Sequence, residues 1–217
     1  MEGVIGSGVR VEATLGDRRR LASVGIRVGL VTAACWTVFG LESILRPEPE
    51  NYRDLVWVLP FSLTAVTLTF LHGVQRSAQA GLERVGYAGV MTAMALVVLG
   101  NVGLVTDQPL LAAMSFPWGA LLWTVALFFF GAGTWRAGVV PWYVGLALIL
   151  LEPGSIVTGL LLSPIAPLHE RGGYSAGVEK GLAVAIIAIG LRTWHRRRRD
   201  AEGWGVRSGG GRVVARR

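Results

Sequence analysis

Residues 85–133 read VGYAGVMTAMALVVLGNVGLVTDQPLLAAMSFPWGALLWTVALFFFGAG, two long apolar blocks joined by the turn residues TDQP (106–109). The blocks, Val85 to Thr106 and Leu110 to Gly133, show neither a polar stripe nor an alternating pattern. A soluble helix buries only one stripe, whereas a helix that crosses a bilayer needs about 20 mainly apolar residues. Both blocks meet that length, so we expect two membrane-spanning helices joined by a short turn.

Four further blocks of the same kind lie outside this stretch, and 52% of the 217 residues are apolar. The blocks are Leu21 to Leu45, Leu55 to Val74, Val139 to Leu162 and Ala176 to Trp194. The sequence therefore predicts an all-α, polytopic membrane helix bundle with six transmembrane helices over residues 21–194. A basic segment (1–20) precedes the bundle, and residues 195–217 are expected to form a basic, disordered tail.

The distribution of basic residues predicts the orientation, because cytoplasmic flanks carry the excess of Lys and Arg. With a cytoplasmic N-terminus, 16 of the 21 basic residues fall inside and three fall outside: Arg46, Arg53 and Arg171. Arg27 and Lys180 lie near segment ends, where long side chains reach the interface. An odd number of crossings would place RRR (18–20) or HRRRR (195–199) outside. We therefore predict a cytoplasmic (inner) membrane protein with both termini in the cytoplasm.

The net charge of +7 comes mainly from the terminal segments. Attraction to an anionic leaflet amounts to about 1 kcal/mol per basic residue, so we expect the C-terminal tail to lie against membrane lipid. The tail is Gly-rich and aperiodic and lacks a stacking platform, so no nucleic-acid partner is expected. The single cysteine, Cys35, excludes an intrachain disulfide.

The fifth apolar block contains the strongest candidate for a functional residue, Glu152 in LALILLEPGSIVTG (146–159). An ionisable group near mid-bilayer costs about 2.5 to 3.5 kcal/mol and is functional by default. Pro153 lacks an N–H and clashes with the preceding turn, and Gly154 weakens the helix further. We expect a helix break here, and such breaks in transporters often mark the binding site. A kink whose acid is satisfied by a neighbouring group is the structural alternative.

Other polar residues fall in the same outer half when the N-terminus is inside. They are Glu42 in the first segment, Asn101 in the third, Glu179 and Lys180 in the sixth, and Ser155, which shares a helix face with Glu152. The expected ligand-binding residues are therefore Glu152, Ser155, Asn101, Glu42 and Glu179, lining a polar cavity open to the outside. Taken singly, Glu42, Glu179 and Lys180 could also be solvated interfacial groups.

Small residues at steps of four predict close helix packing. The first segment carries Gly25, Gly29, Ala33 and Thr37, and the sixth carries Gly177, Gly181 and Ala185. These two faces could meet within one chain or between chains, so a homo-oligomer or a membrane protein partner is possible.

Motifs for catalysis, metal binding and dinucleotide binding are absent from the sequence. The three histidines (His72, His169 and His195) fall at different depths or on different sides. We therefore expect no cofactor and no metal site, and the sequence favours a protein that is not an enzyme.

Three functions fit these observations. The first is a solute-handling or ligand-sensing membrane protein in which Glu152 titrates or binds a cationic or polar ligand from outside. The second is a non-catalytic assembly or accessory subunit. The third is an intramembrane enzyme acting on a lipid or prenyl substrate, which requires two acidic groups converging on an apolar cleft.

Overall fold

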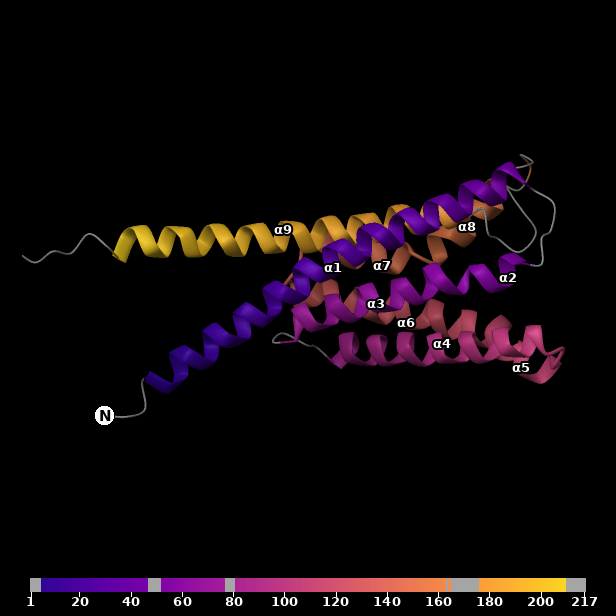
Figure 1. The fold of residues 1–217 in the computed structure, drawn as a ribbon, viewed down its shortest axis with the longest axis horizontal. Coiled ribbons are helices and arrows are strands. Elements are labelled where there is room, and N and C mark those ends of the chain that lie inside the picture. The colour runs from indigo at the N-terminus through magenta and orange to yellow at the C-terminus, as the bar shows by residue number, and fades with distance from the viewer. Residues whose placement is uncertain (1–4, 47–51, 77–80, 163, 165–175, 210–217) are drawn as a thin grey trace, which may run out of the picture.

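The computed structural model describes residues 5–46, 52–76, 81–162, 164 and 176–209, and every regular element in these ranges is helical (Figure 1). The elements in chain order are α1 (Ile5–Leu45), α2 (Tyr52–Val56), α3 (Val58–Gln75), α4 (Gly81–Val105), α5 (Pro109–Ala113), η1 (Met114–Gly119), α6 (Ala120–Ala137), α7 (Trp142–Leu150), α8 (Pro153–Leu162) and α9 (Gly177–Gly209).

Four helical stretches in the described ranges are long and apolar enough to cross a membrane. They are Gly16–Leu45, Val58–Gln75, Gly81–Val105 and Pro109–Ala137, and they correspond to the first four apolar blocks of the sequence. The last of these runs through α5, η1 and α6 and is kinked at Phe116, whose backbone is extended (φ −135°, ψ 126°) before Pro117. The fold is therefore that of a helical membrane protein.

The fifth and sixth blocks are built differently from the first four. The fifth is divided into α7 and α8, neither of which is long enough to cross a bilayer alone. The sixth block forms the first part of α9, and it contains three charged side chains: Glu179, Lys180 and Arg192. The prediction of six crossings is thus supported by helix length and composition for four segments only.

The chain runs back and forth along one long axis (Figure 1). α1 and α9 lie side by side, α4 packs against α6, and α3 joins the two pairs by contacting α1 and α4. α7 contacts α6 and α9, so it closes the other side of the bundle. The start of α1 and the end of α9 lie at the same end of the molecule, which we call the terminal end; the other is the distal end.

The small residues of α1 and α9 meet within one chain. A Cβ added to Gly181 would lie 2.5 Å from Thr37 Oγ1 and 2.9 Å from Ala33 O, and one added to Gly29 would lie 3.0 Å from Ala188 Cβ. Glycine is required here because any side chain would force the two backbones apart. Of the two arrangements left open by the sequence, the structure contains the intrachain one.

α4 and α6 approach each other even more closely. A Cβ on Gly86 would lie 2.2 Å from Phe130 N, and one on Gly133 would lie 2.4 Å from Glu83 N. Large side chains fill the space beside these contacts, among them the fully buried Phe130, Leu127 and Trp123. The backbones of α4 and α6 are therefore in close contact at Gly86 and Gly133.

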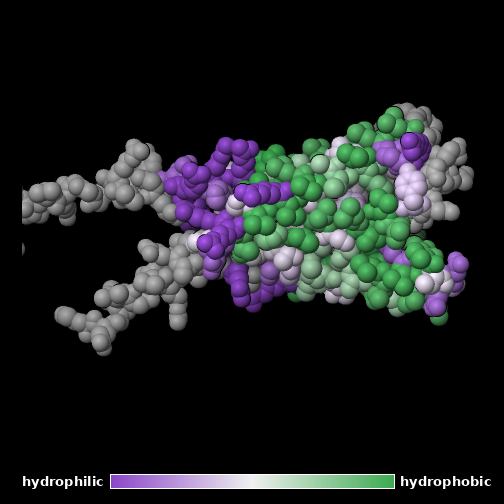
Figure 2. Space-filling model, viewed as in Figure 1, coloured by the Kyte–Doolittle hydropathy of each residue, from purple (hydrophilic) through white to green (hydrophobic). Residues whose placement is uncertain are grey.

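The surface divides into a hydrophobic middle and hydrophilic ends (Figure 2). Hydrophilic residues gather most densely at the terminal end, where α1 and α9 continue past the apolar band. Arg19 on α1 donates a 3.4 Å hydrogen bond to the Arg198 carbonyl oxygen on α9. α9 continues past the apolar block to Gly209, because a helix already begun in the bundle propagates at little added cost. Residues 210–217 lie outside the described ranges.

Candidate functional site

The distal half of the bundle contains the predicted break at Glu152. α7 ends at Leu150 and α8 begins at Pro153, with Leu151 and Glu152 in the turn between them. The Ile156 N–H still donates to the Glu152 carbonyl oxygen (3.1 Å), and the Ser155 hydroxyl donates to the same oxygen (2.8 Å). The Ser155 side chain therefore hydrogen-bonds to the backbone at the break. The Glu152 carboxylate takes no part in these bonds and contacts another helix.

The partner of that carboxylate is Lys180, near the start of α9. Lys180 Nζ lies 2.9 Å from Glu152 Oε1, and the two side chains are only 13% and 15% exposed. A partly buried ion pair is more costly to break than an exposed one, because removal of either partner leaves a poorly solvated charge. The pair therefore links the broken helix to α9.

Trp36 on α1 forms the third side of this site. Lys180 Nζ lies 5.3 Å from the centroid of the Trp36 ring, within the range of a cation–π contact. The ring is itself held in place, since Trp36 Nε1 donates a 2.8 Å hydrogen bond to Thr64 Oγ1 on α3. The site thus combines a carboxylate, an ammonium group and an aromatic face from three separate segments. We call Glu152, Lys180 and Trp36 the distal site.

Two buried polar atoms of α1 and α9, Glu179 Oε2 and Ser43 Oγ, have no hydrogen-bond partner among the described residues. Glu179 precedes Lys180 in α9, and Ser43 lies one turn beyond Gly40, where α1 meets the backbone of Val178 (2.5 Å from an added Cβ). Buried polar atoms are nearly always paired, so unpaired ones indicate a place for water or a ligand. Glu152 and Lys180 compensate each other, and Glu179 is a further acid beside them in the sequence of α9.

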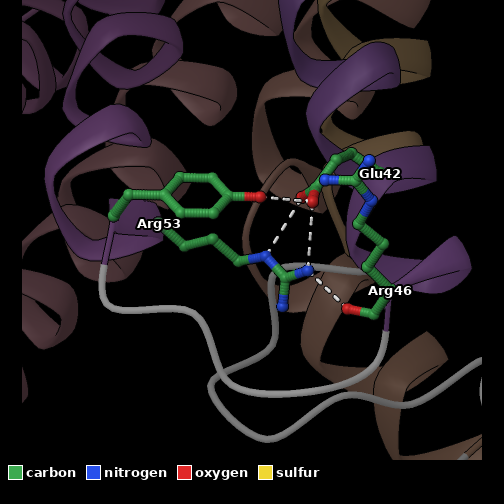
Figure 3. A network of polar contacts seen from close by, with 4 residues as sticks. Glu42, Arg46 and Arg53 are labelled. Carbon is green, nitrogen blue, oxygen red and sulfur yellow. Dashed lines mark hydrogen bonds and ion pairs between the residues drawn. The ribbon is translucent and has the colours of Figure 1, made fainter.

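Glu42 belongs to a separate cluster at the distal end (Figure 3). Arg53 Nε lies 3.0 Å from Glu42 Oε2, Arg53 also donates to the Arg46 carbonyl oxygen, and Tyr52 donates a 2.5 Å hydrogen bond to Glu42 Oε1. The Arg53 side chain is 1% exposed. The hydrogen bond to Glu42 raises the pKa of Tyr52 above its usual value, because deprotonation would place two anions side by side. This cluster ties α2 to the end of α1.

Asn101 lies in another part of the bundle. It is buried on α4 and donates a 2.8 Å hydrogen bond to the Val97 carbonyl oxygen of its own helix. Its neighbour Gly100 packs against Ser115 of η1, where an added Cβ would lie 2.2 Å from Ser115 N. The structure therefore groups Glu152 and Ser155 with the start of α9, and places Glu42 and Asn101 in two other polar environments.

This arrangement limits the chemistry of the distal site. Glu152 is paired with Lys180, and Glu42 is paired with Arg53, so neither acid faces the other. The described ranges contain no group of three or more His, Cys, Asp or Glu side chains that could hold a metal ion. Charge recognition by the carboxylates and the Trp36 ring is the chemistry that these side chains can carry out.

Sequence reasoning missed one polar cluster altogether, at the terminal end. Glu83, in the joint QRSAQAGLER (75–84), is fully buried and pairs with His72. Glu83 falls outside the six predicted apolar blocks, so hydropathy gave no reason to expect its burial. Gly86 and Gly133, which let α4 and α6 approach, were the signals that could have indicated burial of this acid.

No protein-family model matches the chain, and comparisons with curated proteins and with solved structures also find no match. The class of protein is therefore given by the fold alone, a helical membrane protein with an ion pair at a helix break.

Proposed function

We propose that the chain is a solute-handling or ligand-sensing protein that binds a small cationic or polar solute at the distal site. The observation that carries the proposal is the Glu152 and Lys180 ion pair at the break between α7 and α8, beside the unpartnered Glu179 oxygen. Broken helices at membrane depth occur where the backbone is buried in protein or lines a cavity, and in transporters they often mark the binding site.

The proposed topology has six crossings with both termini in the cytoplasm of an inner-membrane protein. In it, α7 and α8 together make the fifth crossing and the apolar part of α9 makes the sixth. Two features support this: α1 begins and α9 ends at the same end of the molecule, and that end carries the arginine runs 18–20 and 196–199. The distal site then opens toward the outside.

The charge of the site favours a cationic group in the ligand. Glu152 and Lys180 are neutral as a pair, and Glu179 adds one negative charge with a buried oxygen to coordinate a donor. A ligand ammonium could pair with Glu179, or displace Lys180 from Glu152 and occupy the face of Trp36. The released Lys180 could then donate to a carboxylate on the same ligand, so small zwitterions also fit.

Calorimetric titration of the purified chain in detergent, with methylammonium, choline and glycine betaine as probes, tests the proposal. At least one probe should bind, and Glu152→Gln or Glu179→Gln should weaken binding by tenfold or more. Glu42→Gln is the matched control, because this acid lies at the same end but belongs to the Arg53 cluster. Binding that is equal in all three variants would overturn the proposal.

If none of the three probes binds, and Glu152→Gln changes only stability, the pair is a structural clamp. That result would favour an accessory subunit, whose polar groups hold the bundle together for a partner. Co-purification from native membrane in a mild detergent would then identify the partner.

A further inference from the structure

The basic ends of α1 and α9 meet at the terminal end of the bundle. Arg19 on α1 donates a 3.4 Å hydrogen bond to the carbonyl oxygen of Arg198 on α9. Residues 18–20 of α1 and 196–199 of α9 are all arginines. Within residues 17–20 and 195–200, these seven guanidinium groups stand against two carboxylates, those of Asp17 and Asp200. The packing of α1 on α9 therefore brings like charges together.

Both basic stretches begin close to the apolar core. Ala22 of α1 and Trp194 of α9 are core residues, and the arginines lie two to five positions beyond them. A helix rises about 1.5 Å per residue, so the arginines lie about 3 to 8 Å past the core. The polar layer of each leaflet is about 5 to 8 Å thick. The surface changes from hydrophobic to hydrophilic at the same place (Figure 2), so these arginines lie at the depth of lipid headgroups.

The Arg198 side chain is held at this level by an aromatic ring. Its guanidinium carbon lies 5.9 Å from the centroid of the Trp194 ring, within the range of a cation–π contact. Trp194 is buried and the Arg198 side chain is exposed, so the ring holds the charge at the edge of the core. Arg19 reaches the backbone of the same residue from α1. Two guanidinium groups from different helices thus lie at one depth.

The charges of the two helices act on a common region, as His195 shows. Burial, followed by the charge of Arg199 on the same helix and that of Arg19 on α1, lowers the pKa of His195. Like charges held this close oppose the packing of α1 on α9, and an anion bound beside them would offset that repulsion. Arginine suits a phosphate anion, because its planar group donates two parallel hydrogen bonds to the phosphate oxygens.

We propose that the ends of α1 and α9 form a binding site for the headgroup phosphate of an anionic phospholipid, centred on Arg19 and Arg198. The acyl chains of the lipid lie against the hydrophobic band (Figure 2). A zwitterionic headgroup carries its own ammonium group, which the arginines repel, so the site selects lipids with net negative charge. The site lies at the opposite end from the distal site and stands whether or not that site binds a solute.

Native mass spectrometry of the full chain, released from detergent micelles, tests the proposal. The probes are phosphatidylglycerol and phosphatidylcholine with the same acyl chains, and the chain should bind phosphatidylglycerol at least about fivefold more tightly. One basic residue contributes about fivefold to the affinity for an anionic lipid surface. Arg19→Gln and Arg198→Gln together should therefore weaken phosphatidylglycerol binding by fivefold or more, and leave phosphatidylcholine binding unchanged.

Arg84→Gln combined with Arg136→Gln is the matched control. It removes the same number of charges from the same end of the molecule, but from α4 and α6. This control should weaken phosphatidylglycerol binding by less than twofold. Equal losses in the two double variants would show a general attraction to the basic end and would overturn the proposal. Equal binding of the two lipids by the native chain would do so as well.

If the Arg19 and Arg198 double variant does not fold, Arg198→Gln alone decides. Its side chain is exposed, and the hydrogen bond from Arg19 goes to its backbone, which the substitution keeps. This variant should lose about fivefold in phosphatidylglycerol binding, and a loss of less than twofold would contradict the proposal.

A large excess of inorganic phosphate separates a lipid site from a site for soluble phosphate. Phosphatidylglycerol should stay bound, because its acyl chains also contribute to binding. Displacement of the lipid would assign the arginines to a soluble phosphate, and the proposal of a lipid site would fail.

Discussion

Trp36 Nε1 on α1 donates a buried 2.8 Å hydrogen bond to Thr64 Oγ1 on α3, and the same indole ring receives Lys180 of α9 on its face. One side chain therefore connects three helices that are separated in sequence by 28 residues or more. The hydroxyl of Thr64 donates in turn to the Pro60 carbonyl oxygen (2.8 Å), which fixes the direction of the contact.

Replacing Trp36 with Phe should lower the free energy of unfolding in detergent by about 1 to 2 kcal/mol. The substitution removes a buried hydrogen bond and part of the cation–π attraction, while it keeps an aromatic ring in the core. Denaturant titration followed by circular dichroism measures the change. Trp142→Phe, at a ring that is 58% exposed, should change stability by less than about 0.5 kcal/mol. Equal losses in the two variants would contradict this account.

Replacing one member of the Glu152 and Lys180 pair should destabilise the fold more than replacing both. Either Glu152→Gln or Lys180→Met alone should cost about 1 to 3 kcal/mol, below the range for fully buried pairs because both side chains keep some exposure. The double variant should recover part of that loss, since no unpaired charge remains. A double-mutant cycle on unfolding free energies gives the coupling, and additive losses would show that the two charges do not interact.

A methyl group at the contact of α4 with α6 should be poorly tolerated. Gly86→Ala places a Cβ 2.2 Å from Phe130 N, and the backbones must separate, so we expect a loss of at least about 1 to 3 kcal/mol. Gly16→Ala on α1 is the matched control, because nothing lies within 4 Å of its added Cβ. That control should be neutral or stabilising by up to about 1 kcal/mol, as alanine favours a helix over glycine. Thermal unfolding of both variants provides the comparison.

Acidification should weaken the terminal end of α9 through His195. Burial, followed by the charges of Arg199 and Arg19, lowers the pKa of His195, so the folded chain binds a proton less readily than the unfolded chain. The stability contributed by neutral His195 is therefore present above the usual histidine pKa of about 6.5 and is lost as the pH falls below it.

The measurement is the unfolding free energy between pH 8 and pH 5, compared for the native chain and His195→Gln. The variant should show a flatter dependence on pH. Arg199→Gln, which removes one like charge, should give an intermediate slope. A variant as acid-sensitive as the native chain would show that His195 does not control this response.

The order of helices could be predicted from hydropathy, and so could the break at Glu152. Pro153 cannot donate a backbone hydrogen bond, and this property is local to the sequence. The partner of Glu152 could not be predicted, because Lys180 lies 28 residues away and its distance depends on how α9 packs on α1 and α7. Lys180 was expected to extend toward the interface, whereas it pairs inside the bundle.

The burial of Glu83 could not be predicted from the sequence, for a related reason. It stands beside Arg84 at the end of a joint that contains several polar residues (75–84), and the residues that pack against it, His72 and Gly133, come from α3 and α6. α1 and α9 also continue beyond the apolar blocks Leu21 to Leu45 and Ala176 to Trp194, because helical hydrogen bonding does not stop where apolar composition stops. Composition predicted which apolar segments avoid water. The packing of the helices determined which charged side chains are buried among them.

The pairing of α1 with α9 has a consequence for biosynthesis. α1 is made well before α9, so Gly25 and Gly29 remain without their neighbours Leu191 and Ala188 until α9 has been synthesised. Contacts between such distant segments form slowly and leave earlier intermediates open. The glycine face of α1 therefore stays uncovered by α9 while the helices between them are made.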